Sequence, residues 1–520
     1  MTSDVIWILE RRVLERGDVV GSGGWGVNAA RDAEASRGRE TPHSPLPTEL
    51  ARRTVQAVST CSLLFLSACH FAPPHVRPPL PTPPVYDGGA SAAAGTRAVN
   101  IGWRDFFADP RLDALIEAAL THNRDLAASV ARIEQARGFY RIQGAQRYPE
   151  PVLAAGASRS HNGRNAAGLG AASDVTIDRA SVNVAVNQFE LDFWGRVRDL
   201  TESARADYLA TVQAQRAFRL SLIQDVASTY LASIETAEQI RLADTTVQSR
   251  REGVRIAQVR FRAGLTSALD LHQAESLLAQ AEAASADLRL TQVQLNNQLL
   301  VLVGGPVPGP LPPPLPLTRQ TTNTLLAAGL PSELLLARPD VLAAEERLRA
   351  AEASIGAARA AFFPTISLTG VLGFASNALN SLVGNDGLTW SFAPTLVTPI
   401  FNRGRLRGNQ IVARAEGAIA VADYERTIQV AFQEVSNALA GRQHLADQVA
   451  AQERGTVAQR QIAALARTRY LEGVVSYIEV LDAERNLFAS EQQLLRLRRA
   501  NVDNLVALYV ALGGGAIERR

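Results

Sequence analysis

Four side chains near the C-terminus have the spacing of a shared charged surface: Ile478, Glu479, Asp482 and Arg485. Steps of three and four residues put them on one face of a helix. Carboxylates held close together repel one another, and a guanidinium beside them can form a neutralising ion pair. The chemistry available here is therefore electrostatic. The alternative is a solvated charged helix face with Ile478 in a seam between helices.

Residues that support catalysis in other proteins lack the required spacing here. The seven His have no metal-ligand spacing, no Ser lies in a G-x-S-x-G motif, and residues 513–515 lack the Lys-Ser/Thr of a phosphate loop. Residues 21–26 fit G-x-G-x-x-G, but the chain then runs into a proline-containing stretch instead of a βαβ unit. An enzyme would rest on that run alone, so we expect no enzymatic activity and no metal or soluble cofactor.

One cysteine stands in the setting of an exported lipoprotein. Arg52 and Arg53 precede roughly a dozen mostly apolar residues and then Leu-Ser-Ala-Cys ending at Cys69, the layout of an export signal. These four residues resemble the bacterial lipobox, whose Cys becomes the first mature residue and carries an N-acyl diglyceride and palmitate. His70 stands where an Asp would indicate inner-membrane retention, so outer-membrane sorting is expected. A short buried helix with an incidental Cys is the alternative.

The signal and the prolines set the expected domain boundaries. Residues 1–68 are a leader that is removed, of which residues 1–50 come from a start site placed too far upstream or leave with the signal. Residues 69–94 hold the anchor and a linker whose prolines impose extended backbone. Two repeats follow, at 95–305 and 333–515, joined by a Pro-rich connector at 306–332.

Composition narrows the class of protein. All 53 basic residues are Arg, and 51 acids bring the formal charge to +2. We therefore expect no nucleic-acid partner, because such binding needs clustered excess positive charge. No apolar run reaches the roughly 18 residues of a membrane helix.

The two repeats are copies of one unit. Three glycine pairs share a separation of 209 residues: Gly195 with Gly404, Gly264 with Gly473, and Gly304 with Gly513. Chance similarity between helices would not keep one offset over so long a stretch, so the chain contains an internal duplication.

Each copy has the same expected order of elements. A helix ends at Pro149 or Pro364, and a hairpin of alternating segments follows, at 152–160 with 175–191 and at 365–376 with 388–401. Segments of about 9 to 11 residues suit transmembrane barrel strands. A small soluble β-subdomain is the alternative.

Long helices are expected at 196–262 and 405–471, each turning at a glycine into a return helix. About 65 residues give on the order of 95 Å, comparable to a periplasmic width. The expected coiled-coil seam is the stripe Leu471, Val474, Ile478, Leu481 and Phe488.

Four strands cannot close a barrel, and open edges are not tolerated in lipid. Three chains would pool 12 strands, an even number within the range of outer-membrane barrels. A homotrimer is therefore expected, although two chains with eight strands satisfy the count as well.

The duplicated unit and the run LPSELLLARPDVLAAEERLRAAEASIGAARAAFFPTISLTG at 330–370 resemble the outer membrane efflux factors of the TolC and OprM type. The lipobox places the chain nearer the lipidated, NodT-like branch. The resemblance covers about residues 95–514. It implies an α+β channel-tunnel trimer with a 12-stranded β-barrel, a periplasmic helical barrel and an equatorial belt. It also implies a periplasmic adaptor and an inner-membrane RND transporter as partners.

The resemblance also assigns roles at the periplasmic tip, where that family has an iris of helix ends. By position, Ile478 is the apolar constriction, Glu479 and Asp482 form acidic rings, and Arg485 is the ion-pair tether. In the first copy Asp270 is a supporting charge, but Gln273 and Ser276 replace Asp482 and Arg485. The second copy therefore carries most of the gate.

Two turns resemble the tips on which adaptor hairpins dock: Gly264, Leu265 and Thr266 in the first copy, and Gly473, Val474 and Val475 in the second. Each glycine also permits a tight helix-helix turn. The expected function is a passive outer-membrane exit duct of a tripartite multidrug efflux pump. A channel for type I protein secretion and a coiled-coil lipoprotein scaffold without transport are the alternatives.

Overall fold

The computed structural model describes residues 71–86, 95–162, 175–306, 310–320, 325–329 and 331–515. These residues belong to the compact unit Ala68–Arg520. Cys69 and the glycine-rich run at 21–26 lie outside the described residues. Of the helices that are described, none combines the length and the apolar character needed to cross a membrane.

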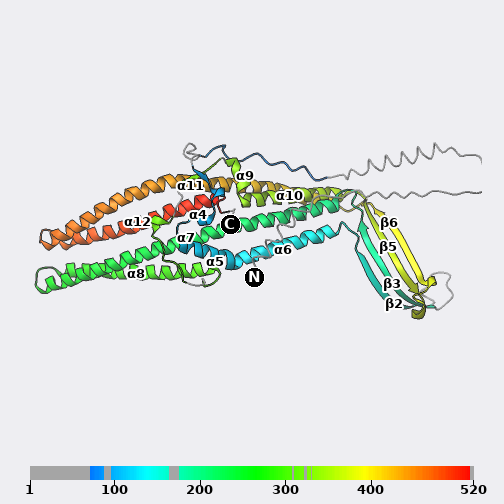
Figure 1. Cartoon of the computed structure of the whole chain (residues 1–520), viewed down its shortest axis with the longest axis horizontal. Coiled ribbons are helices and arrows are strands. Elements are labelled where there is room, and N and C mark those ends of the chain that lie inside the picture. The colour runs from blue at the N-terminus through cyan, green and yellow to red at the C-terminus, as the bar shows by residue number, and fades with distance from the viewer. Residues whose placement is uncertain are drawn as a thin grey trace, which may run out of the picture. The chain divides into compact units, whose positions relative to one another are not determined.

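The duplication appears as two successive sets of elements in the same order (Figure 1). The first set is α6 (Arg124–Ala145), β2 (Pro151–Asn162), β3 (Val175–Glu190), α7 (Arg196–Arg262) and α8 (Ala268–Val303). The second set is α10 (Pro339–Ala360), β5 (Thr365–Ser376), β6 (Leu388–Val397), α11 (Arg405–Leu471) and α12 (Tyr477–Ala511). Shorter elements flank them: β1 (Thr96–Arg97), α4 (Trp103–Phe106), α5 (Pro110–His122), β4 (Leu326–Ala327) and α9 (Leu334–Ala337).

The long helices confirm the sequence prediction at both ends. Helices α7 and α11 have 67 residues each and begin after Gly195 and Gly404, whose φ angles of 74° and 86° favour glycine. Both helices are free of proline and rich in Ala, Leu, Gln, Glu and Arg, which are good helix formers. Their matching lengths keep the two copies in register from the sheet to the turn.

One antiparallel sheet joins the two copies, in the order β2-β3-β5-β6. The central pairing of β3 with β5 contains a register shift between Val186 and Phe189. Strand β6 is shorter than the predicted segment 388–401: it ends at Val397, two residues before Pro399, whose missing N–H cannot extend the ladder. In the single chain β2 and β6 are the outer strands, and the side chains of β6 are exposed.

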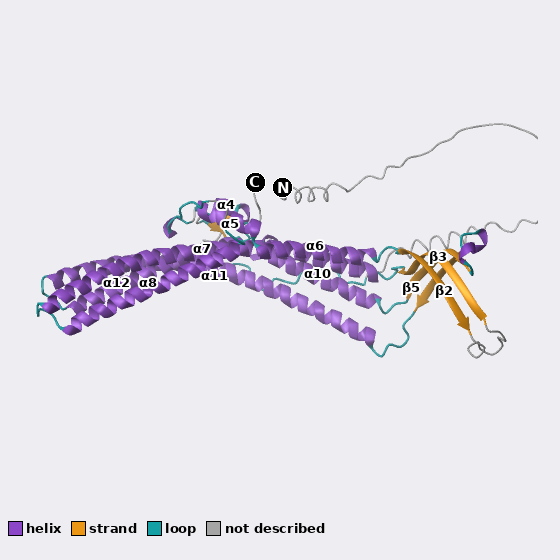
Figure 2. Ribbon diagram, turned by 90° about the horizontal axis from the view of Figure 1, so that it is seen from below, coloured by secondary structure: helices purple, strands orange, loops and turns teal. Residues whose placement is uncertain are grey.

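The main core lies where α5, α7, α11 and α12 meet (Figure 2). Tyr509 of α12 stacks on Phe106 with ring centroids 4.1 Å apart, and its hydroxyl donates to the carbonyl of Ile101 at 2.7 Å. Because this contact spans more than 400 residues of sequence, the C-terminal helix closes the core around the N-terminal segment.

A fully buried carboxylate fastens the Pro-rich connector to this core. Asp109 accepts hydrogen bonds from the Tyr230 hydroxyl at 2.7 Å, the Leu315 amide at 3.0 Å and the Gln320 amide nitrogen at 3.0 Å. It also caps α5 through the Arg111 amide. A buried carboxylate is costly unless it is paired in this way, so the site fixes α5, α7 and the connector together.

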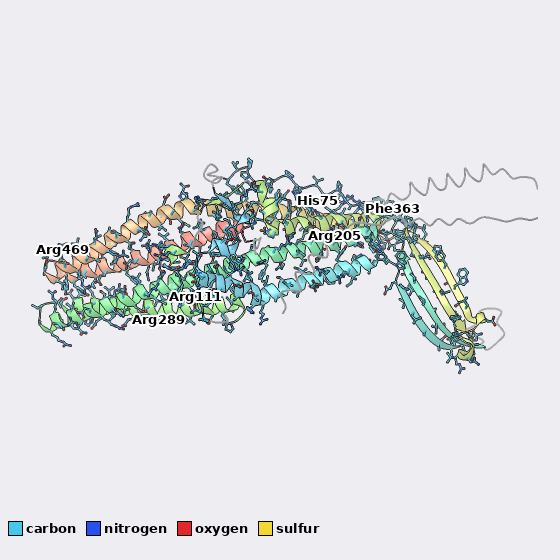
Figure 3. All side chains as sticks on the ribbon, in the orientation of Figure 1. His75, Arg111, Arg205, Arg289, Phe363 and Arg469 are labelled. Atoms are coloured by element: carbon cyan, nitrogen blue, oxygen red, sulfur yellow. The ribbon has the colours of Figure 1, made fainter. Side chains whose placement is uncertain are left out.

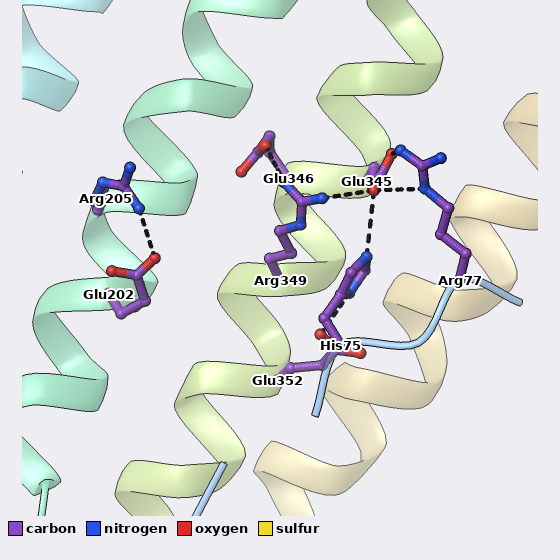
Figure 4. Close-up of polar contacts among 8 residues, drawn as sticks. All are labelled: His75, Arg77, Glu202, Arg205, Glu345, Glu346, Arg349 and Glu352. Carbon is purple, nitrogen blue, oxygen red and sulfur yellow. Dashed lines mark hydrogen bonds and ion pairs between the residues drawn. The ribbon is translucent and has the colours of Figure 1, made fainter. Parts of the chain in front are cut away.

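The segment 71–86 packs along α10 in extended form, as Figure 4 shows. Glu345 of α10 accepts from the Arg77 guanidinium at 3.0 and 3.1 Å, and His75 lies 2.8 Å from Glu352. At the start of the segment, Phe71 stacks on Phe363 with centroids 4.8 Å apart. The chain just after Cys69 is thereby held beside the beginning of β5.

Candidate functional site

The two turns that end α7 and α11 have the same backbone. Gly264 and Gly473 adopt φ angles of 69° and 75°, a region that glycine enters at little cost. In each turn the next amide bonds to a carbonyl five residues back: Leu265 to Arg260 and Val474 to Arg469, both at 2.9 Å. Leu265 and Val474 are 70% and 64% exposed. Each turn therefore presents an apolar side chain to its surroundings.

The first-copy turn uses its acid to cap a helix. The Ser267 hydroxyl accepts from the Asp270 amide, and the Asp270 carboxylate accepts from the Ser267 amide, both at 3.2 Å. The Thr266 hydroxyl donates to the same carboxylate. This bond lowers the pKa of Asp270. Asp270 is thus engaged in a capping box at the start of α8.

The second-copy turn uses its acids differently. Within the described chain, Ser476 caps α12 without any side-chain hydrogen bond. Glu479 lies 3.6 Å from the guanidinium of Arg469, which Figure 3 labels at the end of α11. Asp482 pairs with Arg485 one helical turn along. These carboxylates are left about half exposed, at the surface, instead of closing a helix end.

A groove of about 980 Å³ between α8, α11 and α12 brings the predicted gate residues together. Its lining includes the four second-copy candidates: Ile478, Glu479, Asp482 and Arg485. It also includes Gln273 and Ser276, the first-copy counterparts of Asp482 and Arg485. The duplicated positions therefore face one another across a single groove. Asp270 does not line it.

The buried stripe of α12 differs from the predicted seam. Leu481 is buried as predicted and Phe488 is half-buried. Leu471 and Val474, which precede α12, and Ile478 are exposed, the last at 54%, and Tyr477 and Val480 are buried instead. A Cβ on Gly253 of α7 would lie 2.5 Å from the Tyr477 hydroxyl, so α12 seats its tyrosine where α7 has no side chain. Tyr477 therefore takes the place that the prediction gave to Ile478, and Ile478 lines the groove.

One member of the site, Arg469, was not predicted from the sequence. Arg469, the partner of Glu479, has no distinguishing motif among the Arg of this chain. Trp194 is a packing residue: its indole donates to the Pro364 carbonyl at 2.8 Å and stacks on Phe363. The described residues contain no group of three or more His, Cys, Asp or Glu placed to hold a metal.

These features define a class of protein. Two very long helical hairpins, one from each copy, are joined through one shared β-sheet, and the turns of the hairpins carry charged residues. The family model for outer membrane efflux proteins matches residues 115–305 and 330–514. The chain belongs to this family of efflux proteins.

Relatives match over nearly the whole chain. The chain is 39% identical over 467 residues to the cation efflux system protein CusC of Escherichia coli, covering 88% of this chain and 97% of CusC. It is 39% identical over 460 residues to the solvent efflux pump outer membrane protein SrpC of Pseudomonas putida, covering 87% and 97%. The open-state structure of the Neisseria gonorrhoeae MtrE outer membrane channel superposes with a TM-score of 0.77 at 35% identity, covering 86% and 99%. The fold is that of the TolC-like channel-tunnels, and the protein is an outer-membrane component of efflux.

Proposed function

We propose that three copies of this chain form the exit duct of a tripartite, RND-type multidrug efflux pump, anchored by lipid at Cys69. The observation that carries the proposal is the four-stranded sheet with two open edges on an efflux-family fold. Outer strands β2 and β6 each have unpaired backbone groups, which lipid does not tolerate. Pairing β6 of one chain with β2 of the next closes a ring, and three chains supply 12 strands.

Exposed apolar side chains on β6 agree with a lipid-facing or subunit-facing surface. Trp390, Phe392 and Leu396 alternate along the strand and are all largely exposed in the single chain. Residues two apart lie on the same face of a strand, so these three form one apolar stripe. A stripe of this kind has no role on a sheet that faces water.

The lipid anchor is supported by the path of segment 71–86. Phe71 stacks on Phe363, which Figure 3 labels at the end of α10, and the Phe71 carbonyl accepts from Arg359 at 2.8 Å. Phe71 comes two residues after Cys69 in the sequence, and it lies beside the residues that lead into β5. We therefore assign the lipid to the membrane that holds the sheet.

At the other end of the long helices, the exposed turns fit a periplasmic adaptor and the groove fits a gate. Leu265 and Val474 offer apolar contacts to a partner hairpin. In a trimer, the Glu479 and Asp482 carboxylates of three chains would come together and repel, with Arg469 and Arg485 as neutralising partners. The inner-membrane RND transporter would act through the adaptor.

We assign the cargo of the proposed duct only as a class of molecule. The names of CusC and SrpC specify cations and solvents, respectively, at the same identity of 39% to this chain. Similarity of this degree therefore does not select one cargo. We assign small molecules as a class, with selection made by the transporter that feeds the duct.

The proposal is tested in outer-membrane fractions and in planar bilayers. We expect trimers that dissociate only on heating, palmitate label on the wild type and none on Cys69→Ser, and ion-conducting pores from the purified protein. A soluble monomer without pores would overturn the duct and favour a scaffold. Drug accumulation that is unchanged on deletion, with loss of an exported protein, would favour type I secretion.

A further inference from the structure

A buried guanidinium binds the backbone of Leu277, one of the residues that line the groove. Arg250 of α7 is 6% exposed, and its terminal nitrogen donates to the Leu277 carbonyl of α8 at 2.7 Å. The guanidinium carbon lies 5.7 Å from the centre of the Phe488 ring of α12. This side chain of α7 therefore contacts two other helices, one from each copy of the unit.

One acid of α12 lies in the electrostatic field of this charge. Glu484 is half-buried, and its carboxylate is attracted by Arg467 of α11 and by Arg250. Burial raises the pKa of Glu484 and lowers the pKa of Arg250, so both charges are present at a cost. A buried charge is stabilised only while its partner stays close. The pair therefore favours the arrangement in which α12 is seated against α7.

The residues that Arg250 meets lie on a different face of α12 from the groove residues. Tyr477, Glu484 and Phe488 are separated by seven and four residues, which places them on one face. At 3.6 residues per turn, Asp482 and Arg485 lie roughly 100° farther around the same helix. A contact that holds the first face against α7 therefore fixes the direction in which the second face points.

We propose that Arg250 is a positioning residue of the tip: its buried guanidinium holds α12, and with it Glu479, Asp482 and Arg485, in place on α7. The inference rests on the proposed duct function. Removal of the guanidinium takes from Glu484 one of two attracting positive charges and takes from Phe488 its cation. Helix α12 then separates from α7 more readily, and the groove residues lose their common direction.

The neighbouring arginine supplies a matched control. Arg251 is on the same helix and has the same charge, but it is exposed and pairs with Glu282 of α8 at 2.7 Å. It therefore forms no bridge to α12 in the described structure. Arg251→Gln makes the same chemical change as Arg250→Gln without touching the α7–α12 contact.

The test is the single-channel conductance of full-length, lipidated trimers in planar bilayers. We expect Arg250→Gln to raise the resting conductance about tenfold, the effect of losing one charge-assisted contact. Arg251→Gln should leave it at the wild-type level, and Arg250→Lys, which keeps the charge, should recover most of the closure. Glu484→Gln should raise it less, and the double variant Arg250→Gln with Glu484→Gln should match Arg250→Gln alone.

Two results would overturn the inference. The first is equal conductance for Arg250→Gln and Arg251→Gln in intact trimers. The second is a double variant whose conductance increase equals the product of the increases in Arg250→Gln and Glu484→Gln. If Arg250→Gln does not assemble, Arg250→Lys and Glu484→Gln decide the question by the same readout. Failure of the duct proposal would give a different result, because the wild-type protein would then form no pore. If Asp482→Ala with Arg485→Ala still raises conductance while Arg250→Gln does not, the duct stands and the positioning role falls.

Discussion

Helices α8 and α12 are the return helices of the two copies, and they are packed very differently. Four residues of α8 are buried, whereas α12 buries eleven over almost the same length. The contrast is sharpest at matched positions: Val293 is 55% exposed, and its counterpart Val502 is 7% exposed. The same difference recurs at the turns, where α8 begins with a capping box and α12 does not.

This difference shows how duplicated backbones take separate roles. Helix α12 is fixed inside the chain by the core and by α7, so its charged face is held in a defined direction. Helix α8 keeps apolar side chains uncovered: Leu290, Val293, Leu300 and Val301. An exposed apolar stripe on a well-formed helix indicates a surface that another chain covers.

The largest expected effect distinguishes apolar contacts between chains, at α8, from apolar contacts within one chain, at α12. Leu290→Ser with Val293→Ser should weaken the trimer by about 3 kcal/mol per protomer, because each side chain loses apolar burial between chains. Val502→Ser should instead destabilise the protomer itself. Trimer dissociation on heating, followed by electrophoresis, measures the first effect, and circular dichroism measures the second. Leu265→Ser at the exposed turn is the control and should change neither. Trimers of unchanged heat stability in the α8 variant would contradict the assigned surface.

The next effect concerns a charge that α12 buries and α8 lacks. Asp503 pairs with Arg499 at 2.6 Å. Burial raises the pKa of Asp503 to about 6; the charge of Arg499 lowers this pKa, and the charge of Glu235 raises it further. Because the folded chain binds this proton more tightly than the unfolded chain, the stability from this group falls as pH rises from about 4 through 6. Asp503→Asn should remove that dependence.

At pH 7.5 the same variant should gain at most about 3 kcal/mol, since each pH unit between the ordinary and raised pKa is worth about 1.4 kcal/mol. Thermal melting of the purified trimer between pH 4.5 and 8 measures both effects. Gln294→Asn, at the matching position of α8, should leave the pH profile unchanged. A profile of Asp503→Asn that parallels the wild type would show that Asp503 is not the titrating group.

The smallest effect compares the two turns. Asp270→Ala should cost about 1 kcal/mol of unfolding free energy, since it removes the two hydrogen bonds that the Asp270 carboxylate accepts, from the Ser267 amide and the Thr266 hydroxyl. Glu479→Ala should change it by less than about 0.5 kcal/mol, because the pair with Arg469 is half exposed. Hydrogen exchange at the first turns of α8 and α12 locates the loss. Equal losses at both turns would remove the distinction between them.

Much of the fold follows from local sequence. Long proline-free stretches, the glycines 209 residues apart and alternating segments between them specify the helices, the turns and four strands. The Ser267–Asp270 capping box was also readable from its three-residue spacing. The prediction that Asp270 is a supporting charge of the gate did not include this capping role.

Other features depend on contacts between residues that are distant in the sequence, so the periodicity of apolar residues does not predict them. Tyr477 of α12 packs where Gly253 of α7 has no side chain, and the sequence of α12 alone does not predict this contact. The contact of Arg77 with Glu345 joins residues 268 apart. Arg250 has the same side chain as every other basic residue here, and only its burial among three helices distinguishes it.

We propose that the second copy carries the gate within a shared duct. Its most direct test is the resting conductance of Asp482→Ala with Arg485→Ala, against Gln273→Ala with Ser276→Ala at the matching first-copy positions of the same groove. We predict a several-fold rise for the first pair, from loss of a charged contact at the constriction, and wild-type conductance for the second. Unchanged conductance in the first pair, or equal increases in both, would contradict the account.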